Sequence, residues 1–165
     1  MEHYERLEKI GEGAAGVVYK ARDRRTSATV AIKRLRGGRY GDDDQQLSED
    51  LVREAGCLEA CRGHPCVVEL RAAHRDAAGA FLVMEFVWPS LAQVMRERGG
   101  PFPEAEARRL MRQLLDGAAA MHELGVLHRD NVLVDGQGNL KICDFGMSRF
   151  TAKAPRDTRP TLRRW

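Results

Sequence analysis

In the first half of the chain, hydrophobic residues occur in short runs of strand length separated by polar turns. Residues 4–30 predict two strands around a glycine-rich turn, and a third strand ends in the run VAIK at Lys33. Two more apolar runs, Cys66–Leu70 and Gly79–Phe86, predict two further strands. The N-terminal half is therefore expected to be mainly strands.

One helix is expected within this half. Ser48 is a favourable N-cap residue, the acidic residues that follow it suit a first turn, and the helix should end near Cys61. Its inward face repeats with helical spacing at Leu51, Ala55 and Leu58.

The second half of the chain has a different pattern. Residues 90–98 predict a short helix, and residues 103–124 predict a long one that begins at a proline and is followed by Gly125. The apolar stripe expected on the long helix consists of Ala107, Leu110, Leu114, Ala118 and Met121. Two short apolar runs, 132–134 and 140–142, flank a turn at Gly136-Gln137-Gly138 and predict a hairpin.

Composition limits the class of protein. A chain of 165 residues, 43% hydrophobic and 31% charged, fits one moderate core or two small lobes of a globular protein. No apolar run is long enough for a transmembrane helix, so no membrane association is expected. The charged start, MEHYERLEKI, has no signal core and predicts a cytoplasmic or nuclear protein.

Charge and cysteine usage add two expectations. Residues 147–165 carry six basic residues against one acidic residue, and we expect a solvated basic tail rather than a nucleic-acid-binding one. A zinc site at Cys57, Cys61, His64 and Cys66 is an alternative to free thiols. Their spacing fits no common zinc pattern, so we favour free, buried cysteines.

The glycine-rich turn spans residues 11–18 and matches G-x-G-x-x-G-x-V. Glycines let the backbone approach phosphate oxygens and point N–H groups at them. Dinucleotide-binding folds share the glycines, but there the motif opens a helix, whereas Val17 and Val18 favour a strand. Lys33 could be an ordinary surface lysine; its place in VAIK, downstream of the glycines, favours phosphate binding.

Glu54 lies on the same helical face as Leu51 and Leu58. An inward carboxylate needs a cation, and Lys33 is the candidate, although helical spacing alone also allows a solvent-facing glutamate. Further along, the stretch HRDNVLVDGQGNLKICDFG (residues 128–146) places Asp130 and Asn131 at one end of the predicted hairpin and Asp144 at the other. Two acids and an amide suit a site that holds Mg²⁺ and orients a hydroxyl nucleophile.

Together these motifs resemble those of protein kinases, over residues 4–150, and the opening EKIGEGAAGVVYKAR is most similar to cyclin-dependent kinases. The resemblance implies an α+β fold with a small antiparallel β lobe plus one key helix, followed by a helical lobe that is incomplete here. The lobes would be residues 1–87, with the glycine loop, lysine strand, Glu54 helix and hinge strand, and residues 88–150. Residues 151–165 would be the basic tail.

The resemblance also implies ATP and Mg²⁺ as ligands. Catalytic roles would fall to Lys33, Glu54 and Asp130, and the metal ligands would be Asn131 and Asp144. ATP-binding residues would come from the glycine loop, the lysine strand, the hinge and the hairpin: Ile10, Gly11, Glu12, Gly13, Gly16, Val18, Ala31, Lys33, Glu85, Val87 and Leu133.

Other positions follow from the same resemblance. The backbone of Glu85 and Val87 would bond the adenine edge, with Met84 at the back of its pocket. Ser90 stands where related kinases place an aspartate toward the ribose. His128 and Phe145 would join Leu58 and Leu70 in an apolar column that crosses both lobes.

The most important departure from the family lies in the catalytic loop. Kinases place four residues between the catalytic Asp and the metal-binding Asn, whereas Asn131 follows Asp130 directly. The missing residues correspond to up to ~13 Å of extended chain. Two alignments remain open: Asp130 is the catalytic Asp and Asn131 is displaced, or Asp130-Asn131 is the far end of the loop and the catalytic Asp is gone.

Further departures bear on partners and stability. Ala14-Ala15 replaces the family's inhibitory Thr-Tyr pair, and the helix with Glu54 lacks the usual cyclin-binding sequence, so a cyclin partner is not expected. After Arg149 there is no Ala-Pro-Glu and no further helix of the large lobe. We expect uncovered apolar surface, hence a marginal fold or one that depends on a protein partner.

Three functional hypotheses follow. We favour an ATP-binding protein of Ser/Thr kinase type with little or no phosphotransfer. An active ATP-dependent Ser/Thr kinase requires the loop to rebuild. The third is a non-enzymatic interaction module, or an unstable product of a truncated gene or faulty gene prediction.

Overall fold

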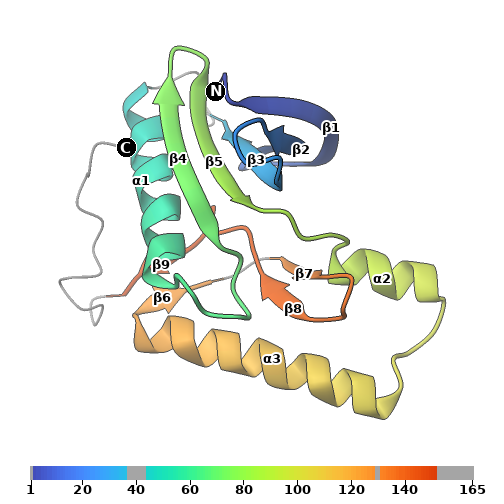
Figure 1. The fold of residues 1–165 in the computed structure, drawn as a ribbon. Coiled ribbons are helices and arrows are strands. Elements are labelled where there is room, and N and C mark those ends of the chain that lie inside the picture. Colours follow the sequence, from blue (N-terminus) through green and yellow to red (C-terminus); the bar gives the residue numbers. More distant parts are fainter. Residues whose placement is uncertain (1, 37–43, 129–130, 152–165) are drawn as a thin grey trace.

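The computed structural model describes residues 2–36, 44–128 and 131–151. Its main feature is a five-stranded antiparallel sheet in the order β1-β2-β3-β5-β4 (Figure 1). The strands are β1 (Tyr4–Gly13), β2 (Gly16–Asp23), β3 (Thr29–Leu35), β4 (Leu70–Asp76) and β5 (Gly79–Glu85). One long helix, α1 (Asp44–Ala60), packs against this sheet through contacts with β3, β4 and β5.

Strand β5 lies between β3 and β4 and is buried on both faces, because a separate apolar cluster covers each face. Alternate side chains point to opposite faces of a strand. Leu82 and Met84 accordingly join the core beneath α1, whereas Phe81 and Val83 join a second cluster with Val30 and Ala21. A continuous apolar run in the sequence thus becomes a strand with two buried faces.

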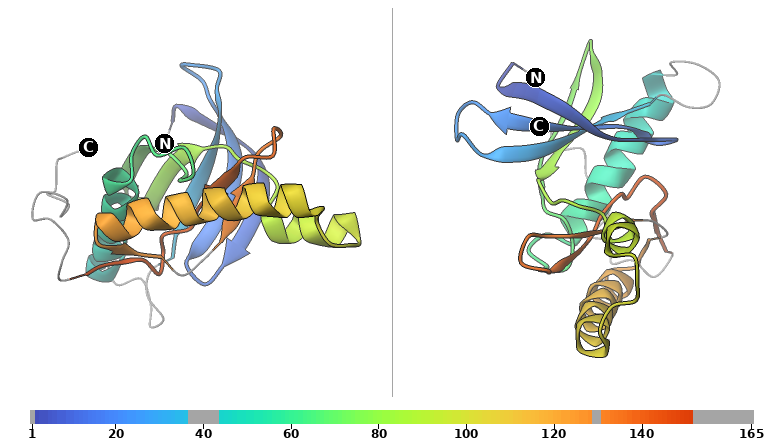
Figure 2. Two further views of the ribbon diagram at one scale, coloured as in Figure 1. Left: turned by 90° about the horizontal axis from the view of Figure 1, so that it is seen from below. Right: turned by 90° about the vertical axis from the view of Figure 1, so that its right-hand side faces the viewer.

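The remaining elements lie below the sheet in Figure 1. They are α2 (Leu91–Arg98), α3 (Glu104–Glu123), β6 (Val126–Leu127), β7 (Val132–Val134), β8 (Leu140–Ile142) and β9 (Arg149–Phe150). Strands β7 and β8 form the expected hairpin, while β6 and β9 form a small sheet that the sequence pattern did not indicate. Figure 2 shows α3 running beneath the other elements, next to β8.

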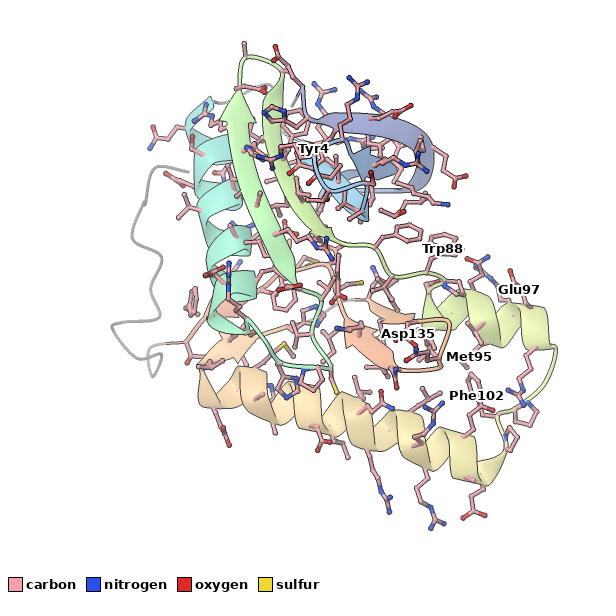
Figure 3. All side chains as sticks on the ribbon, in the orientation of Figure 1. Tyr4, Trp88, Met95, Glu97, Phe102 and Asp135 are labelled. Atoms are coloured by element: carbon pink, nitrogen blue, oxygen red, sulfur yellow. The ribbon has the colours of Figure 1, made fainter. Side chains whose placement is uncertain are left out.

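The two helices expected in this half are confirmed to within one residue. The Ser90 hydroxyl accepts a hydrogen bond from the Gln93 N–H and caps α2, which ends at Gly99 in the left-handed conformation. Figure 3 places Met95 and Phe102 between α2 and α3, and the Arg98 guanidinium lies 5.0 Å from the centre of the Phe102 ring.

Three predicted details are wrong. Helix α1 begins at Asp44, one turn before Ser48, because Leu47 is drawn into the core; the Ser48 hydroxyl bonds Arg75 instead of capping the helix. The strand expected at Cys66–Leu70 begins only at Leu70 and runs to Asp76. On α3, Leu110 and Met121 are buried as expected, but Ala107 is exposed.

The apolar segment before β4 pairs with the hairpin rather than with the large sheet. The Val68 N–H donates to the Ile142 carbonyl at 2.9 Å, and the Ile142 N–H donates to the Cys66 carbonyl at 2.8 Å. This connection brings the hairpin against the sheet and thereby places the residues that follow β8.

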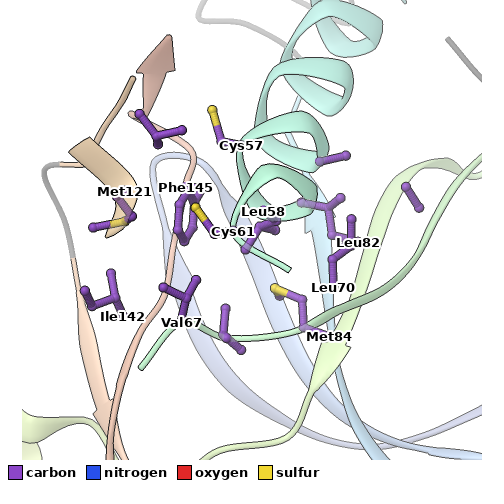
Figure 4. Close-up of a cluster of buried hydrophobic side chains, with 14 of the residues drawn as sticks. Cys57, Leu58, Cys61, Val67, Leu70, Leu82, Met84, Met121, Ile142 and Phe145 are labelled. Atoms are coloured by element: carbon purple, nitrogen blue, oxygen red, sulfur yellow. The ribbon is translucent and has the colours of Figure 1, made fainter. Parts of the chain in front are cut away.

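One buried cluster extends through α1, β4, β5, α3 and β8 (Figure 4). Cys57 and Cys61 belong to it as free cysteines, and burial raises the pKa of the Cys57 thiol to about 12 and that of Cys61 to about 11. Both are therefore protonated at neutral pH.

Among the described helices, none combines the length and the hydropathy of a membrane span.

Candidate functional site

Three charged side chains from separate parts of the chain meet between the large sheet, α1 and the segment after β8. The ammonium of Lys33 on β3 lies 2.6 Å from Glu54 Oε1 on α1 and 2.7 Å from Asp144 Oδ1, just after β8. The side chains of Lys33 and Glu54 are only 4% and 2% exposed, so their charges depend on each other. The ion pair expected between these two residues is present, and the solvent-facing alternative for Glu54 is wrong.

The electrostatics of this group follow from one cation facing two carboxylates. Burial opposes the charge of Lys33, but Glu54 and Asp144 outweigh it and hold the pKa of the lysine above its usual range. Burial likewise raises the pKa of Glu54, and Lys33 only partly offsets this. Burial works against the Asp144 charge as well, but Lys33 and the Gly146 N–H keep its pKa below the ordinary value. With all three groups ionised, this group carries one excess negative charge, which favours a further cation nearby.

Asp144 has an unusual backbone conformation. Its φ is +62°, in the left-handed region that non-glycine residues seldom occupy. The Gly146 N–H donates to Asp144 Oδ1 at 3.2 Å, and Arg53 of α1 donates to the Gly146 carbonyl at 2.9 Å. The carboxylate is thereby held toward Lys33.

Between these polar groups, Phe145 is fully buried. It lies in the same cluster as Leu58 and Leu70, and Figure 4 shows its ring beside Cys61 and Leu58. The His128 ring packs against it with centroids 4.8 Å apart, and His128 Nε2 is 2.8 Å from the Cys143 carbonyl. The structure therefore brings together all four members of the expected apolar column.

The glycine-rich turn connects β1 and β2, so the expected strand after the glycines is confirmed. Ile10, Gly11, Glu12 and Gly13 lie on β1, and Val18 of β2 pairs with Lys33. Gly16 has a φ of +153°, and a Cβ at this position would lie 2.1 Å from the Arg34 carbonyl oxygen, so no other residue fits.

The tip of this turn reaches the residues after β8. A Cβ added to Gly146 would lie 2.9 Å from Ala15 Cβ and 3.2 Å from Lys33 Nζ. The Arg36 N–H donates to the Ala15 carbonyl at 3.3 Å, and Lys9 and Arg36 both pair with Glu12, which lowers the pKa of its carboxyl. Bonds at the start and end of the turn thus hold it over the Lys33–Asp144 pair.

The expected hinge follows β5. Glu85 Oε1 accepts hydrogen bonds from Lys141 Nζ of β8 at 2.7 Å and from the Glu69 N–H at 2.9 Å. Val87 is buried, Ala31 is buried on β3, and Leu133 of β7 forms an isolated bridge with Ser90. Ser90 caps α2, so its hydroxyl oxygen already has a backbone partner.

The candidate metal ligands lie close together along the hairpin. The Cys143 N–H donates to the Asn131 carbonyl at 2.9 Å, which places Asn131 beside the residue that precedes Asp144. The Asn131 side chain is exposed, and that of Asp144 is 30% exposed. Asp130 lies outside the described residues. Carboxylate and amide oxygens suit Mg²⁺, so the donor types fit this ion.

A cation held by Asp144 and Asn131 would need further ligands to complete its coordination shell. Within residues 2–36, 44–128 and 131–151, no three His, Cys, Asp or Glu side chains gather in a way that could hold a metal. Mg²⁺ typically takes one or two carboxylates and completes its shell with phosphate oxygens and water. A nucleotide with its phosphates near Lys33 would supply those oxygens.

Sequence reasoning missed three contributors to this site: Arg53, Lys141 and Ala15. Arg53 and Lys141 contact partners 93 and 56 residues away, and nothing in their local sequence identifies those partners. The contact of Ala15 with Gly146 likewise arises only when the turn folds over the hairpin.

This fold and this arrangement of charged groups are those of a protein kinase domain. Residues 4–163 match that domain, and the chain therefore belongs to the protein kinase family. Within that family, the relatives it resembles include proteins named as cyclin-dependent kinases. The α+β, kinase-like fold expected from the sequence is confirmed, and ATP is the nucleotide that the family implies.

Relatives support this assignment. The chain is 61% identical over 179 residues to "Putative cyclin-dependent kinase F-2" of Oryza sativa subsp. japonica, covering 100% of this chain and 53% of that protein. "Cyclin-dependent kinase G1" of Arabidopsis thaliana is 36% identical over 158 residues, covering 90% and 26%. "Cyclin-dependent kinase 20" of Danio rerio is 35% identical over 154 residues, covering 91% and 44%. The chain thus spans about half the length of the rice relative and less of the other two.

Proposed function

We propose that this chain binds ATP together with Mg²⁺ and transfers phosphate to protein serine or threonine weakly or not at all. The assembled group of Lys33, Glu54 and Asp144 supports binding. The direct succession of Asp130 and Asn131 supports the loss of transfer.

In this proposal the binding steps belong to residues that the structure describes. Lys33, oriented by Glu54, contacts the phosphates, while the glycine-rich turn covers them with its backbone N–H groups. The hinge backbone of Glu85 and Val87 bonds the adenine edge, and Ala31, Val18 and Leu133 enclose its faces. Asp144 and Asn131 hold Mg²⁺, which neutralises phosphate charge when bound.

Transfer needs an additional element, namely a base that orients the hydroxyl nucleophile. Phosphoryl transfer depends on positioning rather than on covalent help from the protein. Without the four-residue spacer, Asp130 and Asn131 cannot reach both the hydroxyl and the metal in the family's usual geometry. A rate loss of several orders of magnitude is the expected result.

The alignment with the rice relative is consistent with residues missing from this chain. Its alignment extends over 179 positions, more than the 165 residues of this chain, so it carries residues without a counterpart here. This supports a shortened segment, and in our proposal the direct succession of Asp130 and Asn131 is one such segment.

A paired experiment tests the proposal. Binding of Mg-ATP is measured by titration calorimetry, and transfer of the γ-phosphate to a serine peptide is measured on the same preparation. Wild type should bind Mg-ATP and show little transfer, and Lys33→Ala should lose binding. An Asp144→Asn variant purified in parallel reveals contaminating kinase. Transfer by wild type at an ordinary kinase rate, absent from that control, would contradict the proposal.

Two insertion variants separate the two alignments of the loop. In one, four residues are inserted between Asp130 and Asn131; in the other, four residues that begin with Asp are inserted before Asp130. Recovery of transfer in only one of them identifies the part of the loop that this chain lacks.

An active kinase is the second candidate, because the Lys33–Glu54 pair is already formed in the isolated chain. A protein partner that covers the lower lobe is also part of our proposal. It is supported by Met111 and Leu115 of α3, whose side chains are 54% and 60% exposed.

A further inference from the structure

Arg53 connects helix α1 to the segment that carries Asp144. Its Nη2 donates to the Gly146 carbonyl at 2.9 Å, and its Nη1 donates to Asp50 Oδ1 at 2.5 Å, one turn earlier on the helix. Asp50 therefore orients one side of the guanidinium while the other side bonds a backbone group 93 residues away.

The segment that Arg53 contacts includes a strained residue. A left-handed φ of +62° at Asp144 persists only where neighbouring contacts hold it. Three hydrogen bonds hold the residues that follow Asp144. The Gly146 N–H donates to the Asp144 carboxylate, and the Gly146 carbonyl accepts from Arg53. The Ser148 N–H donates to the Phe145 carbonyl at 3.0 Å.

Arg53 is also the neighbour of Glu54 in the sequence. The same turn of α1 therefore reaches the Asp144 segment twice, through Glu54 and Lys33 to the Asp144 carboxylate and through Arg53 to the Gly146 backbone. A helix that moved away from the sheet would break both connections together.

We propose that Arg53 is a positioning residue for Asp144: it fixes the Gly146 carbonyl and thereby keeps the Asp144 carboxylate directed toward Lys33 and the magnesium that accompanies ATP. This inference deepens the proposed function and rests on it for its consequence in ligand binding. Its consequence for the backbone conformation can be measured without any ligand.

The first arm of the test uses the ligand-free protein. Hydrogen exchange is followed at the amides of Gly146 and Ser148 in wild type, Arg53→Gln and Arg62→Gln. Arg62 is a matched control because it forms the same kind of i,i+3 pair, with Glu59, just past the C-terminal end of α1. Exchange should accelerate about tenfold in Arg53→Gln, as expected for a lost charge-assisted hydrogen bond, and stay unchanged in Arg62→Gln.

The second arm compares two ligands by titration calorimetry. Loss of an outer contact that orients a metal ligand typically weakens metal affinity ~10–100-fold, so Mg-ATP binding should fall by that order in Arg53→Gln. Adenosine lacks phosphates and metal and should bind as it does to wild type. Arg53→Lys keeps the charge but not the planar guanidinium, so its affinity for Mg-ATP should lie between those of wild type and Arg53→Gln.

Each outcome decides the inference. Unchanged exchange in Arg53→Gln, an equal loss of affinity for Mg-ATP and adenosine, or the same behaviour in Arg62→Gln would overturn it. If wild type does not bind Mg-ATP, the proposed function fails, and the exchange arm still decides whether Arg53 holds the Asp144 segment.

Discussion

Lys33 and Glu54 are charged side chains in a place where charge is costly. A buried ion loses several kcal/mol of hydration, and a partner returns that energy only when the geometry is good. Their separation of 2.6 Å provides such geometry, but a well-packed apolar pair would stabilise the fold at least as well. The pair is therefore better explained by ligand binding than by stability.

Removing one partner of this pair should be strongly destabilising. In Lys33→Met, Glu54 and Asp144 lose their common cation, and the free energy of unfolding should fall by about 3–5 kcal/mol. Urea unfolding measures the change. Adding Glu54→Leu to that variant should recover much of the loss.

Lys20 provides the comparison, because it pairs with Glu8 near the surface at 3.1 Å. Lys20→Met should cost no more than about 1 kcal/mol. Equal costs for the two lysine variants would contradict the large stability cost that we expect from leaving Glu54 and Asp144 without their cation.

His74 on β4 should make stability depend on pH. Its Nε2 is buried without a hydrogen-bond partner in the described part of the chain, and the centre of its ring lies 6.0 Å from that of Tyr4. Burial lowers its pKa below the ordinary value of 6.5. The unfolded chain therefore binds a proton more readily than the native protein, so stability is full above pH 6.5 and falls as the pH decreases below it.

The measurement is urea unfolding between pH 7.5 and pH 5.5. His74→Phe should reduce the decline in unfolding free energy, whereas His122→Phe, at an exposed position near the end of α3, should leave it unchanged. If the full decline in unfolding free energy persists in His74→Phe, groups other than His74 cause it.

At the scale of elements, the β7–β8 hairpin is formed locally but placed by distant partners. Its turn is fixed by Asp135, whose carboxylate accepts from the N–H groups of Gln137 and Asn139 (Figure 3). Its position depends on α3, because Gln113 Oε1 accepts from the Leu140 N–H at 2.6 Å. The hairpin in turn positions Asp144, so this contact bears on the site.

Replacing Gln113 tests how firmly α3 holds the hairpin. Leu140 is 1% exposed, so Gln113→Leu would leave a buried N–H without an acceptor and should cost about 1–3 kcal/mol of unfolding free energy. Gln113→Glu keeps an acceptor and serves as the control. Hydrogen exchange at Leu140 should accelerate in the leucine variant alone, and equal exchange in both variants would contradict this role.

At the scale of the whole molecule, several large apolar side chains are uncovered on α3 and beside the small β6–β9 sheet. Met111 and Leu115 are one helical turn apart on α3 and both face solvent. Leu127 and Met147 are also about half exposed. The uncovered apolar surface expected from the sequence is therefore present in the described residues.

This surface should bind a hydrophobic dye. The double variant Met111→Gln/Leu115→Gln should reduce dye fluorescence while changing the unfolding free energy by only about 0.5 kcal/mol, because exposed side chains contribute little. Leu7→Gln, at a 48% exposed position on β1, is the matched control and should reduce it less. A monodisperse, cooperatively melting monomer that binds no dye would contradict the expectation.

The sequence alone determined the elements whose cause is local. Helices α2 and α3 follow from apolar spacing and end residues, and the hairpin follows from its turn. The Lys33–Glu54 pair needed the resemblance to kinases as well, because helical spacing alone also allowed a solvent-facing Glu54. Local signals were insufficient where packing changed a boundary, as in the earlier start of α1 and the later start of β4.

Only the tertiary structure decided which distant polar groups meet. Arg53 with Gly146, Gln113 with Leu140 and Lys141 with Glu85 are joined across 93, 27 and 56 residues. Hydrophobic periodicity is set by the geometry of the helix or strand itself, so it can be recognised in the sequence. A polar side chain can bond any suitable group that packing brings within reach, and that choice is made only when the whole chain folds.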